Sequence, residues 1–147
     1  MSSTHLSLHY HLIFGTKNHE PMIAPDWRPQ LHAFMGGVLR TLGGTPHMIG
    51  GVSDHVHVLF GLQATHCLAD VVCELKAVSS KWVHDAIKWK GFAWQEGYGA
   101  FTVSASQQAR MRAYIANQED HHRHRTFREE YLAFLRYSGV AFDEQYV

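Results

Sequence analysis

The chain has 147 residues, of which 46% are hydrophobic and 18% are charged, and its formal net charge is zero. This length suits one domain that buries its own core, so we take residues 1–147 as a single domain. No stretch reaches the roughly 18 consecutive apolar residues of a membrane span. The N-terminus lacks the basic start of a signal peptide, and we therefore expect a cytoplasmic protein.

The charges are unevenly distributed along the chain. A net charge of zero argues against attraction to nucleic acid over the whole surface, but from Lys76 to Arg128 nine residues are basic and four are acidic. This segment predicts a basic surface on one side of the molecule. The thirteen histidines would add positive charge below neutral pH, which makes any affinity for phosphates pH-dependent.

The first half of the sequence predicts a strand, a helix and a hairpin. Apolar and polar residues alternate over 5–15, which is typical of a strand. Asp26 can cap a helix that Gly43 and Gly44 end. A short strand at 46–50 then turns into an apolar strand at 52–61. The apolar stripe of the helix comprises Leu31, Phe34, Val38 and Leu42.

The second half predicts a helix from a cap at Thr65 to about Trp89, a strand at 100–103 and a third helix at about 105–121 that opens with capping-box spacing. An amphipathic helix ended by Gly139 follows. The two cysteines, six apart in the first of these helices, would have Cα atoms about 9 Å apart, beyond disulfide reach. The order βαββαβ with appended C-terminal helices predicts an α+β, ferredoxin-like antiparallel sheet.

Two histidines, His55 and His57, lie two residues apart within the apolar strand at 52–61. Successive side chains on a strand point to opposite faces, so both imidazoles project from one face. The pair can therefore present two nitrogen ligands to a metal ion. By itself, however, a His-x-His pair on a strand is more often structural than metal-binding.

Tyr114 and Gln118 are spaced i, i+4, which places them one turn apart on one helix face. Two imidazoles and a carboxamide oxygen make a mixed site with open positions for water and phosphate oxygens. A metal ion there would polarise a phosphoryl group. A tyrosine beside it could attack phosphorus and form a covalent phosphotyrosine.

Two other histidine groups offer alternatives. His9 and His11 lie on the first strand, which neighbours the third in a ferredoxin-like sheet, but they have no associated nucleophile, so a polar strand face at an interface is favoured. The sequence HHRHR at 121–125 could bind a metal, yet a solvated basic helix end is the favoured interpretation.

Several segments in order resemble the IS200/IS605-type transposases, the small single-tyrosine members of the HUH endonucleases. They are YHLIFGTK near the start, DHVHVLF at 54–60, LKAVSSKW at 75–82, WQEGYGAFTVS at 94–104, YIANQEDHHRHRTFREEYLAFL at 114–135 and FDEQY near the end. The resemblance covers nearly the whole chain. It implies that His55 and His57 are metal ligands, that Gln118 completes the metal site, and that Tyr114 is the nucleophile.

The resemblance further implies a divalent metal, Mg²⁺ or Mn²⁺, single-stranded DNA as substrate, and a 5′-phosphotyrosine intermediate with a free 3′-OH. Members of this family recognise a DNA hairpin near the cut site. They form homodimers in which the strands of two protomers join and the tyrosine helix of one subunit can complete the active site of the other. These expectations describe a metal-dependent DNA transposase.

Five polar residues are candidate contacts to the DNA backbone: Lys76, Ser80, Lys81, Arg123 and Arg125. Two other functions stay open. A protein of the same fold could bind a nucleic-acid hairpin without cutting it, or be retained by its host, although sheet-face binders usually carry aromatic residues on the central strands. A zinc hydrolase would need three histidines, and no motif positions a third one.

Overall fold

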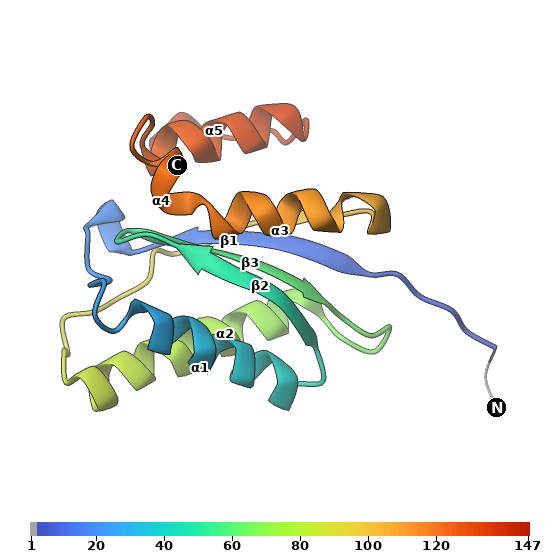
Figure 1. Ribbon diagram of the computed structural model, residues 1–147, viewed down its shortest axis with the longest axis horizontal. Helices are drawn as coiled ribbons and strands as arrows, with labels where there is room; N and C mark the ends of the chain where they lie inside the picture. The colour runs from blue at the N-terminus through green and yellow to red at the C-terminus, as the bar shows by residue number, and fades with distance from the viewer. Residues whose placement is uncertain (1–2) are drawn as a thin grey trace.

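The computed structural model describes residues 3–147 and contains a four-stranded antiparallel sheet with helices on both faces (Figure 1). The strands are β1 (His9–Gly15), β2 (Thr45–Gly51), β3 (His55–Gly61) and β4 (Gly99–Thr102). Their order in the sheet is β2-β3-β1-β4, so the two strands that carry His-x-His pairs are neighbours at the centre. The predicted α+β, ferredoxin-like arrangement is confirmed.

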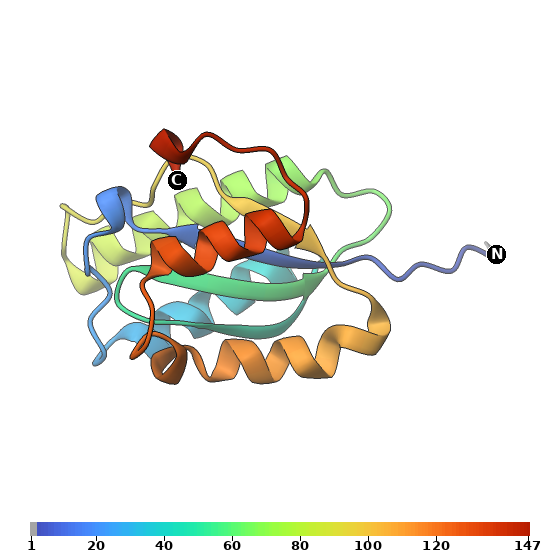
Figure 2. The same ribbon diagram turned by 90° about the horizontal axis from the view of Figure 1, so that it is seen from above.

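Five α-helices within residues 3–147 cover the sheet. They are α1 (Arg28–Thr41), α2 (Leu68–Trp82), α3 (Gln108–Ala116), α4 (Gln118–His121) and α5 (Phe127–Tyr137). Helices α1 and α2 lie on one face, whereas α3, α4 and α5 lie on the other (Figures 1 and 2). The described residues also contain four short helical segments, of which the last follows α5: η1 (Lys17–His19), η2 (Val83–Ile87), η3 (Ala105–Gln107) and η4 (Glu144–Tyr146).

The alternation along β1 and β3 divides the core into two layers. Leu12, Phe14, Val56, Val58 and Phe60 are fully buried in the cluster that also contains the apolar residues of α1 and α2. The residues between them face α3 and α5, and this second face includes the histidines. The C-terminal helices therefore bury a polar strand face that would otherwise lie in solvent.

Several predicted boundaries are wrong by a few residues. Strand β1 begins at His9, rather than in the alternating residues before it, because neither β3 nor β4 extends far enough to pair with them. Helix α1 begins at Arg28, and no side chain caps it, so Asp26 is not its N-cap. Helix α2 ends at Trp82 and continues as the π-helical turn η2.

The predicted helix at about 105–121 is interrupted. Helix α3 ends at Ala116 and α4 begins at Gln118, with non-helical backbone angles at Asn117. The side-chain amide of Asn117 donates to the carbonyl of Ala113 at 2.9 Å. Such a local side-chain bond competes with regular helical hydrogen bonding, and the chain changes direction between Tyr114 and Gln118.

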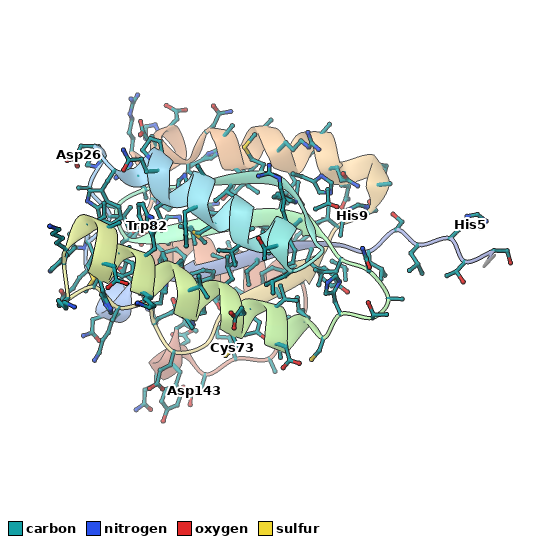
Figure 3. All side chains as sticks on the ribbon, turned by 90° about the horizontal axis from the view of Figure 1, so that it is seen from below. His5, His9, Asp26, Cys73, Trp82 and Asp143 are labelled. Atoms are coloured by element: carbon teal, nitrogen blue, oxygen red, sulfur yellow. The ribbon has the colours of Figure 1, made fainter. Side chains whose placement is uncertain are left out.

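No helix within residues 3–147 is long and apolar enough to cross a membrane. Cys67 and Cys73 are both free, as predicted, and both are exposed. Cys67 precedes α2 as its N-cap residue, and Figure 3 shows Cys73 on α2.

Candidate functional site

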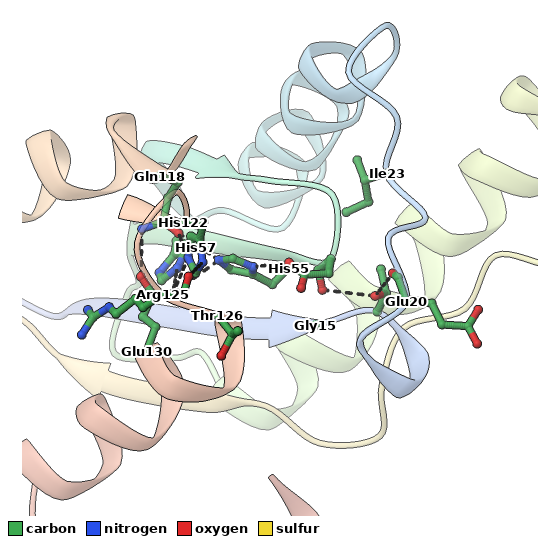
Figure 4. A network of polar contacts seen from close by, with 12 residues as sticks. Gly15, Glu20, Ile23, His55, His57, Gln118, His122, Arg125, Thr126 and Glu130 are labelled. Carbon is green, nitrogen blue, oxygen red and sulfur yellow. Dashed lines mark hydrogen bonds and ion pairs between the residues drawn. The ribbon is translucent and has the colours of Figure 1, made fainter. Parts of the chain in front are cut away.

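The four residues predicted to form the site lie together on the sheet face covered by α3, α4 and α5. His55 and His57 on β3 are fully buried. Nε2 of His55 lies 2.8 Å from Oε1 of Gln118, and the ring of Tyr114 meets the ring of His57 edge-on with centroids 5.9 Å apart. Figure 4 shows the histidines and Gln118 pointing toward one another from different elements.

Glu130 of α5 is a fifth member that the sequence interpretation did not include. Its carboxylate is fully buried, and Oε1 lies 2.9 Å from Nε2 of His57 and 3.4 Å from Nε2 of His55. Its second oxygen, Oε2, accepts hydrogen bonds from the hydroxyl of Tyr114 and, at 3.1 Å, from the amide of Gln118. One carboxylate thus contacts all four predicted residues.

His122 is a sixth member. Its Nε2 lies 3.0 Å from Oε1 of Gln118 and 3.2 Å from Oε1 of Glu130. The prediction that 121–125 forms a solvated basic helix end is therefore wrong for His122, because the chain turns back toward the sheet after α4. From the sequence motifs we expected no third histidine at this site. In the structure, His122 lies beside the pair formed by His55 and His57.

Two signals in the sequence could have revealed these residues. His122 follows Gln118 by four residues, which is the spacing of one helix face. Glu130 falls on the apolar stripe of an amphipathic helix, where a carboxylate is out of place unless it has a partner. The buried residues of α5 are Phe127, Glu130, Tyr131, Leu132 and Leu135.

Each of the three histidines has a partner for its outer nitrogen, Nδ1. The contacts are His55 to Oδ1 of Asp54 at 2.8 Å, His57 to Nε2 of His11 at 2.8 Å, and His122 to the carbonyl of Arg125 at 2.9 Å. Such contacts orient metal-binding histidines in proteins. His11 therefore supports His57 from behind, while His9 contacts His47 at 3.1 Å, outside the cluster.

The hydrogen-bond pattern calls for positive charge among these side chains, supplied by a bound cation or by a protonated imidazole. The amide nitrogen of Gln118 donates to Glu130, so its oxygen faces His55 and His122. Nδ1 of both histidines faces an oxygen acceptor and carries the proton, which leaves a lone pair on Nε2 in the neutral ring. Nitrogen lone pairs then face oxygen lone pairs. A metal ion or added protons would satisfy these atoms, and the donor set fits a divalent metal.

The charges of the cluster follow from burial and these contacts. Burial opposes a charge on His55, but hydrogen bonds to Asp54 and Glu130 outweigh it and raise the pKa of His55 to about 9. Burial lowers the pKa of His57 to about 4. Burial also works against the Glu130 carboxylate, yet hydrogen bonds from His122 and the other two histidines hold its pKa far below the usual range. The cluster thus contains an ionised carboxylate.

Neighbouring groups have opposing effects on the pKa of Tyr114. Burial and the hydrogen bond to Glu130 raise the pKa of its phenol, whereas the Arg125 guanidinium, which donates to the phenol oxygen at 3.2 Å, acts to lower it. The ring of His121 stacks on Tyr114 at 4.4 Å. Both hydrogen-bond partners of the hydroxyl are therefore charged side chains.

A cleft of about 570 Å³ opens beside the cluster. Its lining includes Asp54, His122, Arg123, His124, Arg125 and Phe127. Two of the predicted DNA contacts, Arg123 and Arg125, thus border the site. The cleft thus places these two guanidinium groups, together with the carboxylates of Asp54, Glu119 and Glu129, next to the buried donors.

The other three predicted DNA contacts, Lys76, Ser80 and Lys81, belong to α2 on the opposite face of the sheet. The ammonium group of Lys76 donates to two backbone carbonyls at 2.7 and 2.8 Å. Lys81 is exposed and pairs with a neighbouring aspartate. The structure does not bring these three residues to the cluster.

A sequence model of the IS200-like transposase family matches residues 4–118. The crystal structure of a Deinococcus radiodurans protein assigned as a transposase is similar, with 26% identity, a TM-score of 0.63 and a match over 80% of this chain and 96% of that one. A REP-associated tyrosine transposase bound to a REP hairpin shares the fold at 15% identity, with a TM-score of 0.60 over 83% of this chain and 74% of that one. No curated protein matches the sequence. The chain belongs to the IS200-like transposase family, and it is a transposase enzyme by that membership.

Proposed function

We propose that this transposase cleaves and rejoins single-stranded DNA through Tyr114, with a divalent metal held by His55, His57 and Gln118. The observation that carries the proposal is the meeting of a tyrosine hydroxyl and convergent nitrogen and oxygen donors beside an open cleft. Membership of a transposase family supports the choice of DNA as substrate.

The chemistry conserves bond energy. The phenol oxygen of Tyr114 attacks phosphorus, the bond from phosphorus to the 3′-oxygen breaks, and the products are a 5′-phosphotyrosine and a strand with a free 3′-OH. Glu130 lies where it can accept the phenol proton, and the departing 3′-oxygen takes a proton from solvent water to become the 3′-OH. A bound divalent ion would polarise the phosphate and neutralise charge in the transition state. Attack by a 3′-OH on the phosphotyrosine rejoins the DNA.

Three further features complete the proposal. The enzyme recognises a DNA hairpin near the cut site, which the hairpin-bound transposase of the same fold supports. It acts in the cytoplasm as a homodimer with composite active sites. Arg123 and Arg125 contact the DNA backbone from the cleft, and Lys76, Ser80 and Lys81 stay candidate contacts on the other face.

The test is incubation of the protein with labelled single-stranded DNA from the flanks of its own gene, with Mn²⁺, Mg²⁺ or EDTA, followed by a denaturing gel. We expect a metal-dependent covalent protein–DNA band that Tyr114→Phe abolishes and Tyr137→Phe retains, because Tyr137 is 91% exposed on α5. Hairpin binding without a covalent band under every metal would instead favour the alternative, a host-retained or non-cutting protein that binds nucleic-acid hairpins.

A further inference from the structure

We propose that His122 and Glu130 are metal ligands alongside His55, His57 and Gln118, and that the resulting site selects a first-row transition-metal ion over Mg²⁺. This inference rests on the proposed function and narrows the choice of metal. The match to the family model covers residues 4–118 and so ends at Gln118, whereas His122 and Glu130 follow it in the chain.

The positions of the donor atoms suit a single ion. Ligand atoms of His55, His57, His122 and Glu130 all lie within 4.8 Å of one another. Ligands bind zinc-like ions at about 2.1 Å, so two ligands on opposite sides of one ion are about 4.2 Å apart. Small side-chain movements would therefore bring all four onto one ion, with Gln118 as the fifth donor.

His122 presents a lone pair to this cluster when its ring is neutral. Its Nδ1 faces the carbonyl of Arg125 at 2.9 Å, which can only accept, so this nitrogen carries the hydrogen. In the neutral ring, Nε2 then directs its lone pair between the oxygen atoms of Gln118 and Glu130, which lie 3.0 and 3.2 Å away. The neutral His122 thus has the orientation of a metal ligand, with its outer nitrogen held by a carbonyl.

Glu130 needs a compensating positive charge. Its carboxylate is fully buried, and its partners among residues 3–147 are three imidazoles, a phenol and an amide. Among these partners only a protonated imidazole can supply positive charge, and burial of an uncompensated carboxylate is costly. A divalent ion next to Oε1 would supply the charge.

The helix that carries Glu130 is held firmly in place. Thr126 caps its first turn by accepting from the backbone N–H of Glu129 at 3.2 Å. The ring of Phe127 stacks on His55 with centroids 4.2 Å apart and planes within 6° of parallel. Helix α5 thus holds the carboxylate of Glu130 next to the histidines in a fixed position, as a preorganised ligand requires.

The donor types determine the metal. Three imidazole nitrogens suit zinc, cobalt, nickel and related ions, whereas Mg²⁺ prefers oxygen ligands and retains several waters. A site of two histidines and one amide oxygen would discriminate only weakly between Mg²⁺ and these transition-metal ions. The addition of a third imidazole and a buried carboxylate makes a set of three nitrogens and two oxygens, which favours Zn²⁺, Co²⁺ and Mn²⁺ over Mg²⁺.

The experiment is calorimetric titration of EDTA-stripped protein with Zn²⁺, Co²⁺, Mn²⁺ and Mg²⁺, together with the visible absorption of the Co²⁺ form. We expect Zn²⁺ and Co²⁺ to bind at least about 100-fold more tightly than Mg²⁺. His122→Gln and Glu130→Gln should each weaken Co²⁺ binding by more than about tenfold and alter its absorption. Circular dichroism would verify that both variants are folded.

Neighbouring residues supply matched controls. His124→Gln changes an exposed histidine of the same segment, and Glu129→Gln keeps the capping-box contact to Thr126. Both should bind metal like the wild type. Equal affinity for Mg²⁺ and Zn²⁺, or unchanged Co²⁺ binding by His122→Gln and Glu130→Gln, would overturn the inference.

The titration contains no DNA, so its outcome is separate from that of the cleavage assay. Metal binding that depends on His55, His57 and Gln118 alone would overturn this inference and leave the proposed function in place. Selective binding through all five residues without any covalent DNA product would support the inference and contradict strand transfer by Tyr114.

Discussion

Tyr114 and Glu130 are joined by a hydrogen bond from the phenol to the carboxylate, although they lie sixteen positions apart in the chain. The other oxygen of Glu130 lies 2.9 Å from Nε2 of His57. A single side chain of α5 thus connects the predicted nucleophile with the predicted metal ligands. Helix α5 is therefore part of the site and not only a cover for the sheet.

The first prediction concerns the acidity of Tyr114. Burial and then the hydrogen bond to Glu130 raise its pKa, so Glu130→Gln, which removes the negative charge, should lower it. Ultraviolet difference titration of the metal-free variant against its Tyr114→Phe derivative measures this pKa. Glu129→Gln serves as the control, and the same Tyr114 pKa in both variants would show that Glu130 does not influence the phenol.

The second prediction concerns Asp54, which contacts Nδ1 of His55 at 2.8 Å. Because this carboxylate orients the imidazole and raises its basicity, Asp54→Asn should weaken metal binding by about 10- to 100-fold. Calorimetry with Co²⁺ measures the affinity. Asp70→Asn on α2 is a control on the opposite face of the sheet, and equal affinities of the two variants would refute a supporting role for Asp54.

The third prediction concerns the contact between β2 and α3. A Cβ atom on Gly50 would collide with the carbonyl oxygen of Ile115 and approach its Cγ2 to 2.8 Å. Gly50→Ala should therefore push α3 away from the sheet, destabilise the protein by about 1–3 kcal/mol, and reduce adduct formation by the adjacent Tyr114. Urea unfolding and the DNA gel measure the two effects.

A matched glycine supplies the control for that experiment. Gly37 lies in α1 with no atom within 4 Å of the position of a Cβ. Gly37→Ala should stabilise the protein by about 0.5–1 kcal/mol, since alanine loses less conformational freedom in a helix. If both alanine variants were equally stable, close packing at Gly50 would not be what holds α3.

The sequence was most informative where one local pattern determines the structure. Alternation and turn residues predicted the ferredoxin-like order, and the period of a strand placed His55 and His57 on one face. The break at Asn117 could not be predicted in the same way, because it depends on a side-chain bond to Ala113 that competes with the helix.

The remainder of the site depends on tertiary packing. His122 and Glu130 reach the cluster only because the chain reverses after α4 and α5 packs across β1 and β3. The local sequence does not predict which face of the sheet a C-terminal helix will cover. The local signs of this packing were the charge of Glu130 on an otherwise apolar helix stripe and the four-residue spacing of His122 from Gln118.

The fourth prediction concerns His32 of α1, outside the cluster. Among residues 3–147 its Nε2 has no hydrogen-bond partner, and burial, together with nearby Arg28, lowers the pKa of His32 from 6.5 to about 4. The unfolded chain therefore binds a proton at higher pH than the folded one. Stability should fall as the pH drops from about 6.5 toward 4, by about 2 kcal/mol between pH 7 and pH 5 from this residue.

Urea unfolding at several pH values tests this prediction. His32→Gln cannot take up a proton, so its stability should decline less than that of the wild type between pH 7 and pH 5. His5→Gln, in the exposed segment before β1, is the control. Parallel stability curves for wild type and His32→Gln would contradict the assignment.

Mass-spectrometric mapping of the covalent protein–DNA product, after nuclease and protease digestion, directly tests whether Tyr114 is the nucleophile. We expect a nucleotide joined through its 5′-phosphate to the peptide that contains Tyr114, formed only when a divalent metal is present. Attachment to another residue, or a cleaved strand without any attached peptide, would contradict the assignment of Tyr114 as the nucleophile.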